Sequence, residues 1–271
     1  MLLLRRIEDL TRELEAAISA AREAGEVLRE GFGCRHSLRY KGEVDLVTEV
    51  DEQAERVIKG ILLGAFPSYG MLAEEGGWLS GEEDARWIVD PLDGTTNYAH
   101  GLPIFCVSVA LEKAGEMVLG VVHDPMRGET YAAERGAGAT LNGEPIRVSG
   151  TTEMIGALMV SGFPYDRDQV PSALEFFSRF AMLTQSVRRL GSAALDLCYV
   201  ASGRLDGYYE RGVHTWDVAA GALIVEEARG KVTDYRGGVL DFEDREVVAS
   251  NGLLHPAMIK LTGDSSRQEG A

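Results

Sequence analysis

The sequence has few cysteines and no long apolar run. Its three cysteines, Cys34, Cys106 and Cys198, are far apart and form no Cys-x-x-Cys pair, so we expect neither a disulfide framework nor a zinc or redox site. No apolar run approaches the roughly 20 residues of a membrane span. The start, MLLLRRIEDLTRELEAA, meets charge after three leucines, unlike a signal peptide. We therefore expect a cytoplasmic protein with no membrane partner.

Basic residues are also scarce. The chain has 27 Lys and Arg against 43 Asp and Glu, a formal net charge of -16. Such a surface repels nucleic acid phosphates and anionic membranes, so no nucleic acid partner is expected. An acidic protein that handles phosphate must mask its own charge locally, and bound cations are the usual means.

What is present is ordinary for a globular protein: 271 residues, 45% of them hydrophobic. Apolar spacing predicts helices over 3–32 and 51–63. The character of the chain changes near residue 150, from mostly strands to alternating strands and helices. We expect an α/β (α+β) protein with an N-terminal half at 1–148 and a C-terminal half at 149–271, together one compact catalytic unit.

The pattern in the middle of the chain predicts an antiparallel meander with a tight turn at Asn142-Gly143. Its expected strands are RWIVD, FCVSVALEK, EMVLGVVHD, GETYAAERG and GATLNGEPIRV. The second half should continue with the strands ALMVSG, SVRRLG, DGYYE, KVTDY and EVVAS and with helices over 171–183, 192–202, 216–229 and 256–261. The tail GDSSRQEGA should fray.

The stretch RWIVDPLDGTTNYAHG places two carboxylates, Asp90 and Asp93, at the end of a buried strand. Pro91 cannot donate to a sheet, which predicts that the strand ends at Asp90. A capped strand-to-helix turn would explain one aspartate. It does not explain both, because like charges this close repel unless a cation lies between them. We therefore favour metal binding.

The residues that follow predict a place for phosphate. Gly94 permits a tight turn, and Thr95 and Thr96 suit the first turn of a helix, where backbone N–H groups lack partners. With the carbonyl of Leu92, this segment would offer metal ligands beside an anion-binding helix start.

Two other acidic positions fit the same scheme. Glu74 and Glu75 lie in MLAEEGG, although paired glutamates are often only solvated surface. Asp217 lies near the start of a helix, WDVAAGALIVEEARG, and could simply cap it. However, the small residues after it would let this helix pack very closely, beside the bulky Trp216.

Oxygen ligands without His or Cys clusters indicate a hard cation, Mg²⁺ first. Carboxylates shared between two ions beside a phosphate cradle suit transfer of a phosphoryl group to water.

WIVDPLDGTTNYAHGLPIFCVSVAL and WDVAAGALIVEEARG resemble the two signature motifs of the inositol monophosphatase family. GEVDLVTEVDEQAE and AEEGG look like its two further active-site segments, and the likeness spans about residues 10–260. SGFPYD and RRLGSAALDLCYVASGRLDGYYERG are most similar to its bacterial inositol-1-monophosphatase branch. The resemblance implies a layered α-β-α-β-α sandwich, a homodimer, Mg²⁺ dependence and lithium sensitivity.

The resemblance also implies ligands for two to three Mg²⁺ ions per subunit. The first would be held by Glu74, Asp90 and the carbonyl of Leu92. The second would be held by Asp90, Asp93 and Asp217, and a third, weaker ion would lie near Glu74.

Catalytic roles carried over from the family fall on Asp51, Thr95 and Glu74, with Asp51 and Thr95 orienting and helping to deprotonate the attacking water. The segment 35–45, with Lys41, resembles a mobile loop over the site. Backbone N–H groups would hold the phosphate, and the polyol hydroxyls would meet the C-terminal half. The expected substrate contacts are Asp93, Gly94, Thr95, Thr96, Ala193, Glu210 and Asp217.

The sequence thus predicts hydrolysis of a small polyol phosphate, inositol 1-phosphate first. The alternatives are a fructose-1,6-bisphosphatase or dual inositol/fructose phosphatase, a 3'-phosphoadenosine 5'-phosphate or histidinol phosphate phosphatase, and a non-catalytic regulatory protein. A haloacid dehalogenase is disfavoured, because its aspartates are separated by one residue and not by two. Arg188 and Arg189 could bind phosphate, but we favour a surface or interface role for both.

Overall fold

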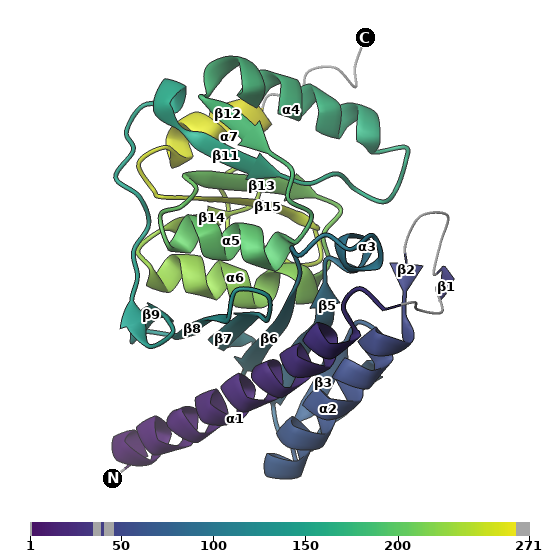
Figure 1. Cartoon of the computed structure of the whole chain (residues 1–271). Helices are drawn as coiled ribbons and strands as arrows, with labels where there is room; N and C mark the ends of the chain where they lie inside the picture. The colour runs from purple at the N-terminus through teal and green to yellow at the C-terminus, as the bar shows by residue number, and fades with distance from the viewer. Residues whose placement is uncertain (1, 35–38, 41–45, 264–271) are drawn as a thin grey trace.

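The computed structural model describes residues 2–34, 39–40 and 46–263 (Figure 1). Most of the predicted loop at 35–45, with Lys41, and nearly all of the predicted frayed tail lie outside these residues. The helices are α1 Leu2–Gly31, α2 Glu49–Ala65, α3 Thr95–Ala99, the 3₁₀ turn η1 Met154–Gly156, α4 Val170–Leu183, α5 Ala193–Ala201, α6 Thr215–Glu227 and α7 His255–Gly263.

The strands form a small hairpin and two larger sheets. The hairpin is β1 Arg39–Tyr40 with β2 Leu46–Val47. The larger sheet contains β3 Gly70–Ala73, β4 Gly77–Leu79, β5 Ala85–Asp93, β6 Cys106–Lys113, β7 Glu116–Asp124, β8 Glu129–Glu134, β9 Gly138–Leu141 and β10 Glu144–Pro145. The smaller sheet contains β11 Leu158–Ser161, β12 Ser186–Arg188, β13 Gly207–Arg211, β14 Lys231–Thr233 and β15 Glu246–Ser250.

The elements stack in five layers (Figure 1). The eight-stranded sheet has the order β10-β9-β8-β7-β6-β5-β3-β4, and the five-stranded sheet has the order β12-β11-β13-β15-β14. Helices α1 and α2 cover the outer face of the larger sheet, α5 and α6 lie between the two sheets, and α4 and α7 cover the smaller sheet. The predicted α-β-α-β-α sandwich is confirmed.

The central layer is apolar on all sides, because it packs against a sheet on each side. In α6 every residue from 218 to 225 is buried. A Cβ on Gly120 of β7 would lie 2.7 Å from the carbonyl oxygen of Ala220, and a Cβ on Gly221 would lie 2.7 Å from Leu197 Cβ. The predicted close packing of this helix is confirmed, and it brings Asp217 to the end of β5.

Strand β5 does not end at Asp90 as predicted; it continues to Asp93. Asp90 pairs with Ser108 and Asp93 pairs with Cys106, so β5 advances three residues while β6 advances two. This is a β-bulge, where a missing ladder N–H is tolerated, and Pro91 occupies it. Side chains three apart in a regular strand face opposite ways, so the bulge is what lets Asp90 and Asp93 face one cavity.

The hairpin of β3 and β4 was not predicted. Its turn holds Glu74, whose backbone N–H donates to the carbonyl of Val89 at 3.1 Å. Because β3 runs parallel to β5, this turn lies beside the bulge. The tight turn at Asn142-Gly143 is confirmed by φ values of 52° and 86°.

The remaining expected strands and helices occur close to their predicted places. In the part of the chain that the structure describes, no helix is both long and apolar enough to cross a membrane.

Candidate active site

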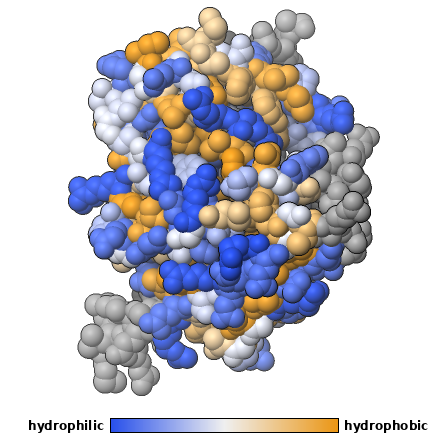
Figure 2. Space-filling model, in the orientation of Figure 1, coloured by the Kyte–Doolittle hydropathy of each residue, from blue (hydrophilic) through white to orange (hydrophobic). Residues whose placement is uncertain are grey.

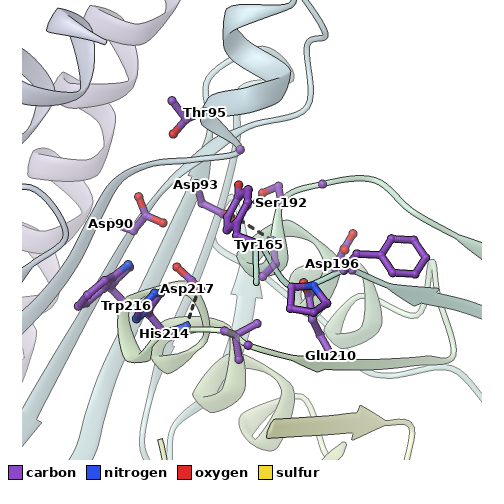
Figure 3. Close-up of a pocket in the computed structure, with 18 of the residues that line it drawn as sticks. Asp90, Asp93, Thr95, Tyr165, Ser192, Asp196, Glu210, His214, Trp216 and Asp217 are labelled. Atoms are coloured by element: carbon purple, nitrogen blue, oxygen red, sulfur yellow. Dashed lines mark hydrogen bonds between the residues drawn. The ribbon is translucent and has the colours of Figure 1, made fainter. Parts of the chain in front are cut away.

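One cavity of about 290 Å³ opens where the β5 bulge, the starts of α5 and α6 and the end of β13 meet (Figure 3). It gathers acidic residues from distant parts of the chain. Predicted site residues that line it are Glu74, Asp90, Leu92, Asp93, Gly94, Thr95, Ala193, Glu210 and Asp217. The sequence-predicted residues therefore share one cavity, except for Asp51 and Thr96.

Asp93 connects the two halves of the chain. Its Oδ2 accepts hydrogen bonds from Ser192 Oγ and from the backbone N–H of Ala194, both at 2.7 Å, and its Oδ1 accepts one from the N–H of Ala193 at 3.3 Å. Burial raises the pKa of Asp93 to about 6, although these donors oppose the rise. The start of α5 is therefore fixed to the end of β5 through this carboxylate.

Asp90 and Asp217 are each held by a backbone donor. Asp90 Oδ1 accepts from the N–H of Leu92 at 2.9 Å, and Asp217 Oδ2 accepts from the N–H of His214 at 2.7 Å. Burial and neighbouring carboxylates raise the pKa of both groups well above the ordinary value. Among the described residues, no lysine or arginine forms an ion pair with Asp90, Asp93 or Asp217.

Asp51 reaches the cavity only through Thr95. It is fully buried at the start of α2, where its Oδ2 accepts from the N–H of Thr48 at 3.0 Å. Thr95 Oγ1 lies 3.2 Å from Asp51 Oδ1 and 3.0 Å from the carbonyl oxygen of Leu92. Burial raises the pKa of Asp51 to about 6, against the hydrogen bonds from Thr48.

The opposite wall carries Glu210 and a second buried acid, Asp196 (Figure 3). Tyr208 Oη donates to Glu210 Oε2 at 2.9 Å, and burial raises the pKa of Glu210 to about 7. A Cβ on Gly162 would lie 1.9 Å from Glu210 Oε1, so any side chain at this position would displace this carboxylate.

One residue of this wall was missed from the sequence. Asp196 was not singled out, because an acid inside an apolar helix resembles a surface position until the helix is known to be buried. Arg189 is exposed, as predicted, and it also lines the cavity. Thr96, in contrast, is exposed and lies outside the cavity wall.

A family model described as the inositol monophosphatase family matches residues 9–267. The chain belongs to the inositol monophosphatase family. An inositol-1-monophosphatase from Mesorhizobium japonicum is 43% identical over 251 residues, covering 91% of this chain and 94% of that protein. A protein named Nus factor SuhB from Pseudomonas aeruginosa is 42% identical over 254 residues, with 91% and 94% coverage.

A solved structure of the extragenic suppressor protein suhB from Bartonella henselae matches the fold with a TM-score of 0.90 and 38% identity, covering 93% of this chain and 98% of that one. The resemblance stated from the motifs is confirmed, and the chain is a phosphatase of the inositol monophosphatase type. The haloacid dehalogenase alternative is set aside.

The donor chemistry of this family member fits a hard cation. The end of the cavity formed by Glu74, Asp90, Asp93 and Asp217, called the carboxylate end below, offers oxygen ligands. The described residues that line the cavity include no cysteine and one histidine, His214. Within the described part of the chain, no three acidic, histidine or cysteine side chains already stand close enough to hold one ion. Side-chain rotation at Asp90, Asp93 or Asp217 would have to complete a coordination shell.

Proposed function

We propose that this phosphatase hydrolyses a small polyol phosphate monoester, inositol 1-phosphate first, with Mg²⁺ as cofactor. The observation that carries the proposal is the convergence of Glu74, Asp90, Asp93 and Asp217 on one cavity. Three of these carboxylates are buried beside one another, and no lysine or arginine of the described residues forms an ion pair with them, an arrangement that is costly unless a metal ion neutralises it.

The residues that would hold Mg²⁺ are those of the cavity wall. Glu74, Asp90 and the carbonyl of Leu92 would hold a first ion, Asp90, Asp93 and Asp217 a second, and Glu74 would lie near a weaker third. Bound Mg²⁺ lowers the pKa of water and neutralises charge on phosphoryl oxygens.

The chain's own residues would position and deprotonate the attacking water. Thr95 Oγ1 faces the cavity and can accept the proton of a water while passing its own proton to Asp51 Oδ1, 3.2 Å away. With a pKa of about 6, Asp51 is ionised near neutral pH and remains basic enough to receive it. Glu74 would help to place the same water.

Substrate would lie between the bulge and α5. Backbone N–H groups of Gly94 and Thr95 would meet the phosphate, and Ala193 and Glu210 would meet the hydroxyls. Thr96 would act only indirectly, because it lies outside the cavity. We also propose that the halves 1–148 and 149–271 work as one catalytic unit, since the Asp93 contacts to α5 cross between them.

The relatives leave two alternatives to test. The chemistry would also suit fructose 1,6-bisphosphate, or both that ester and inositol phosphate. It would suit less well 3'-phosphoadenosine 5'-phosphate, for which about 290 Å³ is small, and histidinol phosphate, which offers an imidazole and an amine in place of a ring of hydroxyls. A relative at 42% identity is named Nus factor SuhB, so a regulatory role beside catalysis is a second candidate.

A kinetic panel separates these candidates. We expect inositol 1-phosphate to give the highest kcat/KM with Mg²⁺, chelation by EDTA to abolish turnover, and lithium to inhibit it. A higher kcat/KM for fructose 1,6-bisphosphate would replace the assigned substrate. No turnover of any ester with Mg²⁺ would favour the regulatory role.

We also propose a homodimer. Apolar residues gather at the surface where η1, the end of α4 and the segment before α7 meet (Figure 2). They include Ile155, Met182 and Leu253, which are 72%, 80% and 57% exposed, and such patches often mark association surfaces. Sedimentation equilibrium that reports a 29.4 kDa monomer at micromolar concentration would contradict this.

A further inference from the structure

Asp196 is a buried acid that the proposed mechanism does not use. It lines the cavity, its residue is 1% exposed, and its Oδ1 accepts no hydrogen bond from the described residues. Buried polar atoms in proteins are nearly always paired, and an unpaired one in a cavity wall calls for an explanation. Burial, together with Glu210 and Asp93, raises the pKa of this carboxyl well above its ordinary value.

We propose that Asp196 determines specificity: with Glu210 it accepts hydrogen bonds from neighbouring hydroxyls of the polyol and disfavours any substrate that carries a second phosphate at this end. The inference rests on the proposed function and deepens it, because it separates monophosphates of polyols from bisphosphates.

The position of Asp196 follows from the anchoring of α5. Asp93 binds the N–H groups of Ala193 and Ala194 at the start of the helix. Asp196 lies three residues after Ala193, on the same side of the next turn. Figure 3 shows Asp90 and Asp217 on one side of the site and Asp196 and Glu210 on the other. A phosphate held by the first group would direct the rest of a substrate toward the second.

The two acids together offer a pair of acceptors. Glu210 Oε2 is occupied by Tyr208 Oη, which leaves Oε1, and Asp196 contributes its unpaired Oδ1. Two adjacent hydroxyls can donate one hydrogen bond to each. A phosphate dianion has no proton to donate to these acceptors, so a second phosphate at this end would leave them without a partner, which is unfavourable.

Arg189 is the one basic group among the described residues of this wall, and a basic group could attract a second phosphate. It is the single lysine or arginine among the described lining residues, and it opposes the rise in pKa of both Asp196 and Glu210. If Arg189 instead recruited a second phosphate, bisphosphates would be preferred. The substrate comparison distinguishes the two outcomes.

The test compares wild type, Asp196→Asn and the exposed control Asp241→Asn on inositol 1-phosphate and inositol 1,4-bisphosphate with Mg²⁺. Asparagine keeps the shape and replaces one carboxyl oxygen with an amide NH2, which can donate to a phosphate oxygen. We expect wild type to favour the monophosphate in kcat/KM by about tenfold or more, and Asp196→Asn to reduce that ratio about tenfold, on the scale of one lost hydrogen bond. The change should lie mainly in KM, in opposite directions for the two esters. Asp241→Asn should keep the wild-type ratio, since its Oδ1 can still accept from the N–H of Glu243.

Three results would overturn the inference. A wild type that cleaves both esters equally well, or a ratio that Asp196→Asn leaves unchanged, would refute it while the phosphatase assignment stands. No turnover of either ester by wild type would overturn the proposed function, and the inference with it. Thermal unfolding of each variant confirms that it folds, and Asp196→Ser, which also lacks the carboxyl group and can donate a hydrogen bond, must shift the ratio in the same direction.

Discussion

The two ends of the cavity use the same residue type in opposite ways. At the carboxylate end, Asp90, Asp93 and Asp217 each accept a hydrogen bond from a backbone N–H, which lies in the β5 bulge, in α5 or just before α6. At the far end, among the described residues, Asp196 has an oxygen without a partner and Glu210 accepts a hydrogen bond from Tyr208. Neighbouring acids that the backbone anchors suit the binding of a shared cation, whereas acids with spare acceptors suit recognition of a ligand that brings its own donors.

We expect Asp93→Asn to have the largest effect on activity. An asparagine NH2 group that faces the N–H of Ala194 would place two donors against each other, and the site would lose one negative charge that could bind a metal ion. We expect kcat to fall by about 10² or more while the circular dichroism spectrum is kept. Near wild-type turnover in this variant, measured at saturating Mg²⁺, would count against the role proposed for Asp93.

Much of this end could be predicted from the sequence, because Asp90, Pro91 and Asp93 lie within four consecutive residues and a local pattern carries the signal. The layered fold could be predicted too, from apolar periodicity and motif resemblance. The continuation of β5 from Asp90 to Asp93 could not be predicted from the sequence, because a proline ordinarily ends a strand. Only the pairing with β6 shows that Pro91 lies in a β-bulge within the strand. The far end depends on burial of both faces of α5, which is a tertiary property that the position of Asp196 does not reveal.

Gly120→Ala tests whether the close packing of α6 on β7 keeps Asp217 at the carboxylate end. The new Cβ would lie 2.7 Å from the backbone oxygen of Ala220, and backbone cannot rotate away. We expect a loss of about 1–3 kcal/mol in the free energy of unfolding, from overpacking, with a loss of activity as α6 shifts Asp217. Urea unfolding measures the first effect.

Gly60→Ala in α2 is the matched control for that variant. A Cβ there meets nothing within 4 Å, and alanine has the higher helix propensity, so stability should be equal or greater by up to about 1 kcal/mol. Equal destabilisation by both substitutions would mean that close packing of α6 on β7 is not what the glycine at position 120 provides.

Gly162→Ala tests whether Glu210, at the far end of the cavity, binds substrate without taking part in the chemical step. Its Cβ would overlap Glu210 Oε1, which must then turn away. We expect KM for the polyol phosphate to rise by about three- to tenfold, as for one weakened hydrogen bond, with a smaller change in kcat because the carboxylate end is untouched. Gly156→Ala, where a Cβ meets nothing within 4 Å, should leave both constants unchanged. A fall in kcat alone would place Glu210 in the chemical step.

The smallest expected effect is on stability against pH, measured in EDTA. The folded-state pKa of Glu210, about 7, lies above its ordinary value of about 4.3. Between these values the folded chain binds more protons than the unfolded chain, so the free energy of unfolding falls as pH rises from about 4.3 to about 7. Asp90, Asp93 and Asp217 have raised pKa values as well and contribute with the same sign.

Glu210→Gln should therefore flatten this decline without abolishing it. The difference in Tm between pH 5 and pH 8 should shrink by about 2 °C or more, whereas the exposed Glu243→Gln should leave it as in wild type. When Mg²⁺ replaces EDTA, the loss of stability between pH 5 and pH 8 should become smaller in wild type and in Glu210→Gln, because a cation at the carboxylate end stabilises the ionised carboxylates that high pH favours. If Glu210→Gln instead steepened the decline, Glu210 would be stabilised in its ionised form in the folded chain, and the far end would resemble the carboxylate end in its anchoring.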